Sequence, residues 1–445
     1  MRRRDVLWHL GAGLLMLAGA TFAGEAQVSP GENPHPVHLV RPHAAPLSAM
    51  AQLGQKIFYD PSLSSSGQLS CASCHSPQHA YGAPNDGPVM LGGADLTRQG
   101  ARAVPSLGYL ERQPNFSIGP EQSDDNVVSV TIVAALGQKS TRATKTATGT
   151  AASAANIVPQ GGLFWDGRAD TLQGQALFPL LDPREMDGGS IERVAGLLRH
   201  APYFERFVGL FGAGVLNSSR LLVSEAMFAV ARYQFEDATF HPYTSKYDYW
   251  LEGKARLSES ELRGLQLFND PDKANCAGCH LSSPTRDGLP PLFTDHQYEA
   301  LGAPRNAALI QNRDPTYFDL GVCGPQRKDI AERQYCGMFL TPTLRNVATR
   351  HAFFHNGVFG SLQQVLDFYN FRDTNPEKIY PLGADGRLQK YNDIPQAYRT
   401  NVDVADPPFN RHPGDEPAMT PQDEADIIAF LKTLTDGFQP ARSTD

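Results

Sequence analysis

The sequence predicts a mainly α-helical fold built of two similar halves in tandem, with few short strands. The pentapeptide Cys-Ala-Ser-Cys-His at residues 71–75 returns as Cys-Ala-Gly-Cys-His at residues 276–280. Before each copy, apolar residues recur at three- and four-residue steps, which is the spacing of one helix face. Alternating strand patterns are sparse throughout the chain. The repeat therefore indicates two related halves that arose by duplication.

Two cysteines three positions apart, followed directly by a histidine, form the attachment signature of a c-type haem. The thiols form thioether bonds to the porphyrin, and the histidine then ligates the iron. A zinc or disulfide pair is the alternative, but two copies in a similar context favour two covalently bound haem c groups. We therefore expect two cytochrome-c-like haem domains. Their attachment thiols are Cys71, Cys74, Cys276 and Cys279, and their iron-binding histidines are His75 and His280.

The length of the chain, 445 residues, exceeds one compact core and favours two domains. A formal net charge of −8 argues against nucleic acid as a partner. The expected boundaries are a signal peptide at 1–26, an N-terminal haem domain at 27–240, a linker at 241–254, a C-terminal haem domain at 255–437 and a tail at 438–445.

The N-terminus is typical of a secretory signal. Residues 2–4 are all arginine, residues 7–17 are largely apolar, and small residues follow up to Ala26. An uncleaved anchor is the alternative. No later stretch approaches the ~18 apolar residues that span a bilayer. We therefore expect a periplasmic protein without a membrane span after signal cleavage.

Two of the six cysteines lie outside the haem motifs, at Cys323 and Cys336. In an oxidising compartment, two leftover cysteines at this short separation are expected to form a disulfide. Two buried free thiols are the alternative.

The helix before each motif carries a glycine and, four positions later, a phenylalanine. The matching positions are Gly54 with Phe58 in residues 48–60, and Gly264 with Phe268 in residues 258–270. The glycine would allow a close helix contact, and the phenylalanine would cover a haem edge. Further amphipathic helices are expected at 191–211, 219–235 and 420–434, with Thr420 as a good N-cap. Residues 27–45, rich in proline and histidine, should form an irregular lead-in.

Several longer motifs resemble those of the bacterial diheme cytochrome c peroxidases and their MauG-type relatives. They are Phe-Trp-Asp-Gly-Arg at 164–168, Thr-Pro-Thr-Leu-Arg-Asn-Val at 341–347, Phe-Phe-His-Asn-Gly at 353–357 and the stretch 361–370. The resemblance spans nearly the whole chain in the family's order. It implies an oxidoreductase that reduces hydrogen peroxide at the first haem and uses the second haem for electron transfer. Electrons would come from a small c-type cytochrome, a cupredoxin or another donor.

The resemblance also implies roles for particular residues of the first site. Trp165 would lie between the haems and relay charge between them. Gln175, Pro179 and Glu185 would line the open face of the peroxidatic haem. Glu185 would take a proton from the near peroxide oxygen and return it to the leaving oxygen. Burial in a mostly apolar pocket would raise the pKa of that carboxyl toward neutrality.

The distal ligands separate subtypes of the family. Residues 87–93 contain no histidine, which predicts an open first haem that is active without prior reduction; Met90 is the alternative ligand. At the second haem, Tyr369 stands where ordinary peroxidases carry methionine and MauG-type enzymes carry tyrosine. Met338 and His355 are the rival ligands. His355 would otherwise hydrogen-bond near the haem propionates, with Arg345 as a charge partner.

Three departures from the family pattern stand out. The stretch 102–105 lacks the asparagine of the family's calcium site, and the other two ligand positions are Arg350 and Ala352, so calcium is expected to be lost or replaced by the Arg350 side chain. Ala274 stands where MauG-type enzymes carry an electron-exit tryptophan. An insert at 107–161, with an expected strand at 127–133, would fold over the mouth of the first haem or remain flexible.

Three functions remain open at this stage. The leading one is a peroxidase. The second is a MauG-like enzyme that oxidatively modifies a protein partner through a bis-ferryl state, although Ala274 weakens it. The third is a non-enzymatic two-haem electron carrier.

Overall fold

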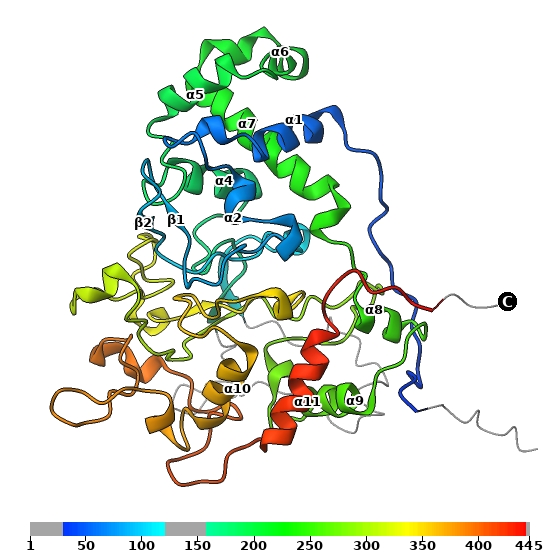
Figure 1. Ribbon diagram of the computed structural model, residues 1–445, viewed down its shortest axis with the longest axis vertical. Coiled ribbons are helices and arrows are strands. Elements are labelled where there is room, and N and C mark those ends of the chain that lie inside the picture. The colour runs from blue at the N-terminus through cyan, green and yellow to red at the C-terminus, as the bar shows by residue number, and fades with distance from the viewer. Residues whose placement is uncertain (1–29, 121–156, 442–445) are drawn as a thin grey trace, which may run out of the picture.

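The computed structural model describes residues 30–120 and 157–441. The expected signal peptide at 1–26 and the expected strand at 127–133 lie outside these ranges. Figure 1 shows one lobe that holds α1, α5, α6 and α7, and a second lobe that holds α9, α10 and α11. The described helices are α1 (Ala49–Phe58), α2 (Cys71–Cys74), α4 (Leu172–Leu181), α5 (Ile191–His200), α6 (Glu205–Phe211), α7 (Ser219–Glu236), α8 (Lys246–Leu251), α9 (Glu259–Asn269), α10 (Leu362–Phe371) and α11 (Pro421–Lys432).

The strands are short, as expected, and form antiparallel pairs. β1 (Leu91–Gly92) pairs with β2 (Arg98–Gln99), β3 (Ser117–Pro120) with β4 (Ile157–Gln160), and β5 (Tyr298–Glu299) with β6 (Phe339–Leu340). β3 and β4 are the described ends of the insert. They lie against the second half, since Ile118 packs near Val322 and Tyr335, and Gln160 bridges Gln297.

The two halves repeat the same helix crossing. α1 crosses α7 at Gly54, where a Cβ atom would lie 1.8 Å from the Ala229 carbonyl oxygen. α9 crosses α11 at Gly264, where a Cβ atom would lie 1.9 Å from the Asp426 carbonyl oxygen. No side chain fits at either position, because interiors are close-packed. The sequence expectation of close helix contacts at both glycines is therefore confirmed.

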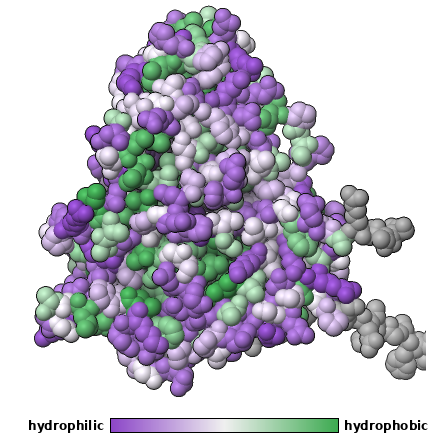
Figure 2. Space-filling view, viewed as in Figure 1, coloured by the Kyte–Doolittle hydropathy of each residue, from purple (hydrophilic) through white to green (hydrophobic). Residues whose placement is uncertain are grey.

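Two hydrophobic cores follow from these crossings. The first gathers residues of α1, α5 and α7, and the second gathers residues of α8, α9 and α11. Phe58 belongs to the first core and Phe268 to the second, and both are almost fully buried. In the view of Figure 2, hydrophilic side chains cover much of the surface, with hydrophobic ones in small patches between them.

The boundary between the halves differs from the expected one. Residues 241–254 are not a simple linker, because they contain α8, whose Tyr247, Trp250 and Leu251 are buried in the second core. The lead-in also belongs to the second half: Leu39 is buried there, and the Val37 amide donates to the Leu251 carbonyl at 2.9 Å. Both segments lack a long periodic pattern, so their partners are set by tertiary contacts alone.

The remaining helices match the sequence expectations with two exceptions. The stretch 191–211 is broken into α5 and α6 near Pro202, which cannot continue a helix from the preceding turn. α4 was not expected, because Pro179 lies inside it. α11 begins after the N-cap Thr420, whose side chain accepts a hydrogen bond from the Asp423 amide, as anticipated.

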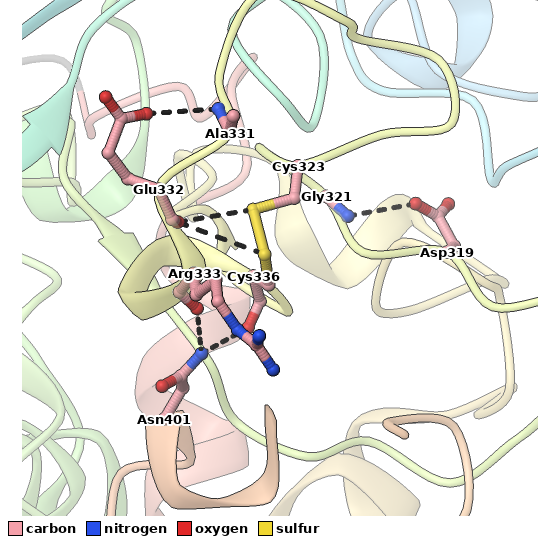
Figure 3. Close-up of a disulfide and its surroundings, with 8 residues drawn as sticks. All are labelled: Asp319, Gly321, Cys323, Ala331, Glu332, Arg333, Cys336 and Asn401. Carbon is pink, nitrogen blue, oxygen red and sulfur yellow. Dashed lines mark hydrogen bonds between the residues drawn. A yellow bond between two sulfur atoms is a disulfide. The ribbon is translucent and has the colours of Figure 1, made fainter. Parts of the chain in front are cut away.

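The expected disulfide between Cys323 and Cys336 is present (Figure 3). Beside it, the Asn401 side-chain amide donates to the carbonyls of Arg333 and Cys336 at 2.7 and 3.0 Å. The bridge and this side chain together hold a loop of the second half that has little regular structure.

Candidate haem sites

The first motif forms a short helix followed by its histidine. α2 consists of Cys71–Cys74, and the Ser70 amide donates to the Ser73 hydroxyl at 3.0 Å. The Nδ1 atom of His75 lies 3.1 Å from the Tyr81 carbonyl oxygen. A carbonyl can only accept, so Nδ1 carries the proton and Nε2 keeps its lone pair for a metal.

The second motif repeats this arrangement. The Nδ1 atom of His280 lies 2.8 Å from the Phe293 carbonyl oxygen, which again leaves Nε2 as the ligand atom. Burial lowers the pKa of His75 and of His280 to about 4. Both imidazoles are therefore neutral at pH 7, the form that binds iron.

The four motif cysteines form no disulfide with one another. A cavity of about 200 Å³ adjoins the second motif and is lined by Cys276, Cys279 and His280 together with mainly apolar side chains such as Phe268 and Phe353. Two thiols, a neutral histidine and an apolar cavity are the groups that a covalent haem requires, so the residues fit this cofactor.

Tyr369, on α10, lines the same cavity as His280. Its ring stacks on Phe409 with a centroid distance of 5.2 Å. Its hydroxyl has no hydrogen-bond partner within the described ranges. Burial, with a contribution from the nearby Cys279 thiol, raises the pKa of Tyr369 far above its usual range. The phenol is thus held neutral until a cation or metal faces it.

The two rival ligands lie differently. Met338 packs against the cluster of Tyr298, Val322 and Tyr335 and does not line the cavity. His355 does line it, but its ring stacks on Phe339 at 3.6 Å. Its Nε2 atom lies 3.8 Å from an Asp393 carboxylate oxygen. The imidazole is therefore held at the cavity wall by its neighbours.

Arg345 lies elsewhere than expected. Its guanidinium pairs with both Asp248 carboxylate oxygens, at 2.8 and 2.9 Å, and sits between the rings of Tyr109 and Tyr243. It does not line the cavity around His280. A carboxylate from α8 already neutralises its charge, and the role of Arg345 as a haem charge partner stays a prediction.

Gln175 and Pro179 both lie on α4, one helical turn apart. Gln175 is buried and lines a second cavity, of about 80 Å³, together with Trp165 and Arg350. The end of α4 leads directly to Glu185, whose amide donates to the Asp182 carbonyl at 3.0 Å. α4 therefore carries Gln175 and Pro179, and Glu185 follows it in the next turn of chain.

Glu185 is half-buried and is held by its backbone from two sides. In addition to the Asp182 contact, its carbonyl accepts a hydrogen bond from the Gly93 amide at 2.8 Å. Burial raises the pKa of Glu185 to about 7, with a further rise from Asp182 and opposing effects from Arg168 and Arg184. Burial raises the pKa of the Cys74 thiol, and the nearby Glu185 carboxylate raises it further. A group with this pKa can both take up and release a proton at neutral pH.

Trp165 borders both cavities. Its indole Nε1 donates to the Ala103 carbonyl at 2.9 Å, and its own carbonyl accepts from the Leu340 amide at 2.9 Å. The next residue, Asp166, pairs with Arg102 at 2.8 Å. The indole is thereby fixed where the two cavities adjoin it.

The family follows from comparison with known proteins. A family model described as "Di-haem cytochrome c peroxidase" matches residues 48–256. The methylamine utilization protein MauG of Paracoccus denitrificans is 33% identical over 341 residues, which cover 75% of this chain and 78% of that protein. The chain belongs to the di-haem cytochrome c peroxidase and MauG family.

Other members extend the likeness over more of the chain. Cytochrome c551 peroxidase of Nitrosomonas europaea is 28% identical over 429 residues, covering 96% of this chain and 91% of that protein. The crystal structure of the diheme peroxidase BthA from Burkholderia thailandensis superimposes with a TM-score of 0.73 at 35% identity, covering 92% of this chain and 94% of that one. This member of the family is therefore an oxidoreductase that acts on peroxide, and it carries two covalently bound haem c groups.

Arg350 occupies the region between the two haem sites of this di-haem peroxidase. One guanidinium nitrogen donates to the carbonyls of Val104 and Ala352, at 3.0 and 3.4 Å. Within the described ranges no cluster of three or more His, Cys, Asp or Glu side chains could hold a metal ion. The replacement of calcium by the Arg350 side chain stays a prediction.

Sequence reasoning missed two residues that organise the sites. Asp248, the partner of Arg345, lies on α8, which was read as linker. Asp319 accepts both Arg102 hydrogen bonds, at 2.7 Å each, and so fastens the segment around Ala103 to the second half. Neither residue lies in a motif. A buried charge needs a partner, so a buried Arg345 would have predicted a carboxylate beside it, although not which one.

Proposed function

We propose that this protein reduces hydrogen peroxide at the His75 site, with Glu185 as the proton-transferring group and electrons supplied through the His280 site. The observation that carries the proposal is the position of Glu185 in the turn that follows α4, the helix of Gln175, where burial raises its pKa to about 7 and its charge acts on Cys74. The bound haem supplies the iron-centred redox chemistry.

Glu185 accepts and returns a proton during peroxide reduction. As a carboxylate it accepts a proton from the peroxide oxygen nearest the metal, and as a carboxylic acid it returns that proton to the oxygen that leaves as water. A pKa near 7 makes both transfers nearly balanced in energy at neutral pH. Gln175, buried on the same helix, offers amide donors to orient the substrate.

Trp165 couples the two sites in this proposal. Its indole borders both cavities and is fixed by hydrogen bonds at either end of the residue. An indole can lose one electron transiently, which suits a relay between two redox centres. The donor is a small c-type cytochrome, a cupredoxin or another one-electron reductant.

The subtype follows from the two distal faces. Residues 87–93 supply no histidine, and Gly93 is engaged with the Glu185 backbone, so we infer a first site that is open to peroxide without prior reduction. Tyr369 is the inferred distal ligand at the second site. A phenolate oxygen favours oxidised iron more than a thioether does.

A second candidate function is oxidative modification of a protein partner. The likeness to MauG and the tyrosine at position 369 favour it. Ala274 is 3% exposed, so this position offers no surface side chain for electron exit. Direct peroxide reduction is therefore preferred. The plain electron carrier does not account for Glu185 at the first site.

The location we propose is the periplasm, on the basis of the signal-like residues 1–26. Among the helices that the structure describes, none is both long enough and apolar enough to cross a membrane. Fractionation of the native host, followed by detection of the chain, tests this assignment.

The deciding experiment is stopped-flow addition of peroxide to the as-isolated holoprotein. We expect a spectral change before any reductant is added, and a loss of about 10²–10⁴-fold in its rate for Glu185→Gln. Glu192→Gln, an exposed glutamate on α5, is the matched control and should react like the wild type. A resting protein that ignores peroxide until it is reduced contradicts the open first site.

Candidate reductants and protein partners then separate the two functions. Turnover with a small cytochrome or cupredoxin supports the peroxidase. A partner whose mass changes only with peroxide supports the protein-modifying enzyme. A resting EPR spectrum with one high-spin and one low-spin haem excludes the simple electron carrier.

A further inference from the structure

Three tyrosines lead from the first haem motif to the protein surface. The first, Tyr81, is joined to His75 through the hydrogen bond between Nδ1 and the Tyr81 carbonyl. Its ring is 2% exposed and stacks on Phe240 with a centroid distance of 3.6 Å. Its hydroxyl is hydrogen-bonded to the Thr239 hydroxyl. Tyr81 is thus a buried phenol on the proximal side of the first site.

Tyr233 and Tyr59 continue the line. Tyr233 lies on α7 and is buried, and its ring packs edge-on against Phe240 with a centroid distance of 5.3 Å. The centroids of the Tyr59 and Tyr233 rings are 6.5 Å apart. Phe58 packs edge-on against all three tyrosines, at 5.3, 5.5 and 6.3 Å from Tyr59, Tyr233 and Tyr81. The aromatic rings therefore form one continuous contact.

The series Tyr81, Tyr233 and Tyr59 ends at the protein surface, because the Tyr59 side chain is exposed to solvent. All 15 tyrosines of the chain lie within the described ranges, and Tyr59, at 44%, is the one whose side chain is exposed. The others are buried or half-buried. Tyr59 follows α1, which lies in the lobe with α5, α6 and α7, whereas α9, which precedes the second motif, lies in the other lobe (Figure 1).

A phenol that loses an electron becomes a strong acid, so its proton needs an acceptor. Tyr81 has one: its hydroxyl donates to the Thr239 hydroxyl, which donates to an Asp237 carboxylate oxygen at 2.7 Å. Asp237 is half-buried and caps the end of α7. The proton can therefore leave Tyr81 along two hydrogen bonds and return when the phenol is reduced again.

We propose that Tyr59 is a second oxidation site of this enzyme, at which small one-electron donors such as phenols are oxidised by way of Tyr233 and Tyr81. The proposal rests on peroxide reduction at the first site. Each peroxide takes up two electrons and two protons and yields two waters. Tyr81 gives one electron to the first site and its proton to Asp237. It then regains its proton from Asp237 and an electron from Tyr59 by way of the intervening Tyr233 ring, and the exposed Tyr59 releases its own proton to solvent. A phenol donor then gives one electron and one proton to Tyr59, and two donors complete each cycle.

The test uses the holoprotein and compares Tyr59→Phe with Tyr398→Phe, a half-buried tyrosine of the second half. With peroxide and no donor, we expect a tyrosyl radical signal and dityrosine-linked dimers that map to the Tyr59 peptide. Both should be lost in Tyr59→Phe and kept in Tyr398→Phe. With a phenol donor, turnover should fall in Tyr59→Phe, whereas turnover with a protein donor should not change.

Two further variants separate the relay from a packing role. Thr239→Val keeps the rings in place but removes the proton path, and it should slow radical formation at Tyr59. Tyr81→Phe should abolish that radical while haem absorbance stays unchanged. If peroxide changes the haem spectrum but Tyr59 is not modified, or is modified equally in Tyr81→Phe, the relay is wrong. If peroxide leaves the wild-type haem spectrum unchanged, the proposed function itself fails.

Discussion

The Arg350 guanidinium donates a hydrogen bond to the Val104 carbonyl 3.0 Å away and so joins the two halves of the chain between their cavities. Burial lowers the pKa of Arg350 to about 10, so it remains a cation at neutral pH. Its charge also acts on His75. Arg350 therefore both links the two halves of the chain and places a fixed positive charge near the first site.

Replacing Arg350 by alanine should therefore destabilise the protein and alter the first haem. The Val104 and Ala352 carbonyls would lose their donor, at a cost of about 1–3 kcal/mol. Thermal unfolding and the first-haem reduction potential measure the two effects. Arg387→Ala, at an exposed arginine, is the control. Unchanged stability and potential in Arg350→Ala would refute the fastening role.

The reaction with peroxide should depend on pH through Glu185. Burial raises the pKa of this carboxyl to about 7, and the reaction needs its deprotonated form as a base. The second-order rate should therefore rise with pH through about 7 and level off above it. Stopped-flow rates over this range provide the measurement. Glu185→Gln should give a flat, low profile; an unshifted profile in that variant would assign the ionisation to another group.

Replacing Tyr369 should change the second haem alone. In Tyr369→Phe the cavity loses its phenol oxygen, so the absorption and EPR signals of that haem should shift while those of the first stay constant. Tyr369→Met should raise its reduction potential. Tyr335→Phe, a buried tyrosine outside the cavity, serves as the control. A shift in a His355 variant and none in Tyr369→Phe would identify histidine as the ligand.

The helix crossing at Gly54 should not tolerate alanine. A methyl group there would collide with the Ala229 carbonyl, and overpacking of this kind costs about 1–3 kcal/mol. Gly196, on α5, has no atom within 4 Å of an added Cβ. Gly196→Ala should therefore stabilise the protein by about 0.5–1 kcal/mol. Chemical denaturation compares the two variants, and equal effects would show that the crossing is not tight.

Asp248→Asn should leave the buried Arg345 guanidinium without a charged partner. Burial opposes ionisation of Asp248, but the pair with Arg345 dominates and lowers its pKa. Removing the carboxylate charge should cost about 3–5 kcal/mol. Because Arg345 contacts no haem cavity, haem content and spectra should stay unchanged in the protein that folds. A selective loss of the second haem would instead show that Arg345 contributes to binding that haem.

The parts of the fold that could be predicted from the sequence depend on local patterns. α9 follows from its capping box at Ser258 and its apolar spacing, and the crossing glycines follow from their repeat before both motifs. The haem ligands follow from the pentapeptide. The Cys323–Cys336 bridge follows from two leftover cysteines in an oxidising compartment.

The rest depends on partners distant in the chain. α4 was hidden by Pro179, and α8 by its brevity, so the pairing of Asp248 with Arg345 could not be anticipated. The pKa of Glu185 depends on burial, which is a property of the whole fold. The line from Tyr81 to Tyr59 joins residues of separate elements and leaves no periodic signal.

The lead-in along the second half has a consequence for the order of synthesis. A chain grows from its N-terminus, so Val37 leaves the ribosome long before Leu251, whose carbonyl accepts its hydrogen bond. The residues of the first core in α1, α5 and α7 all precede Leu251 in the chain. The lead-in can therefore take its place only after the segments that form the first core have been made.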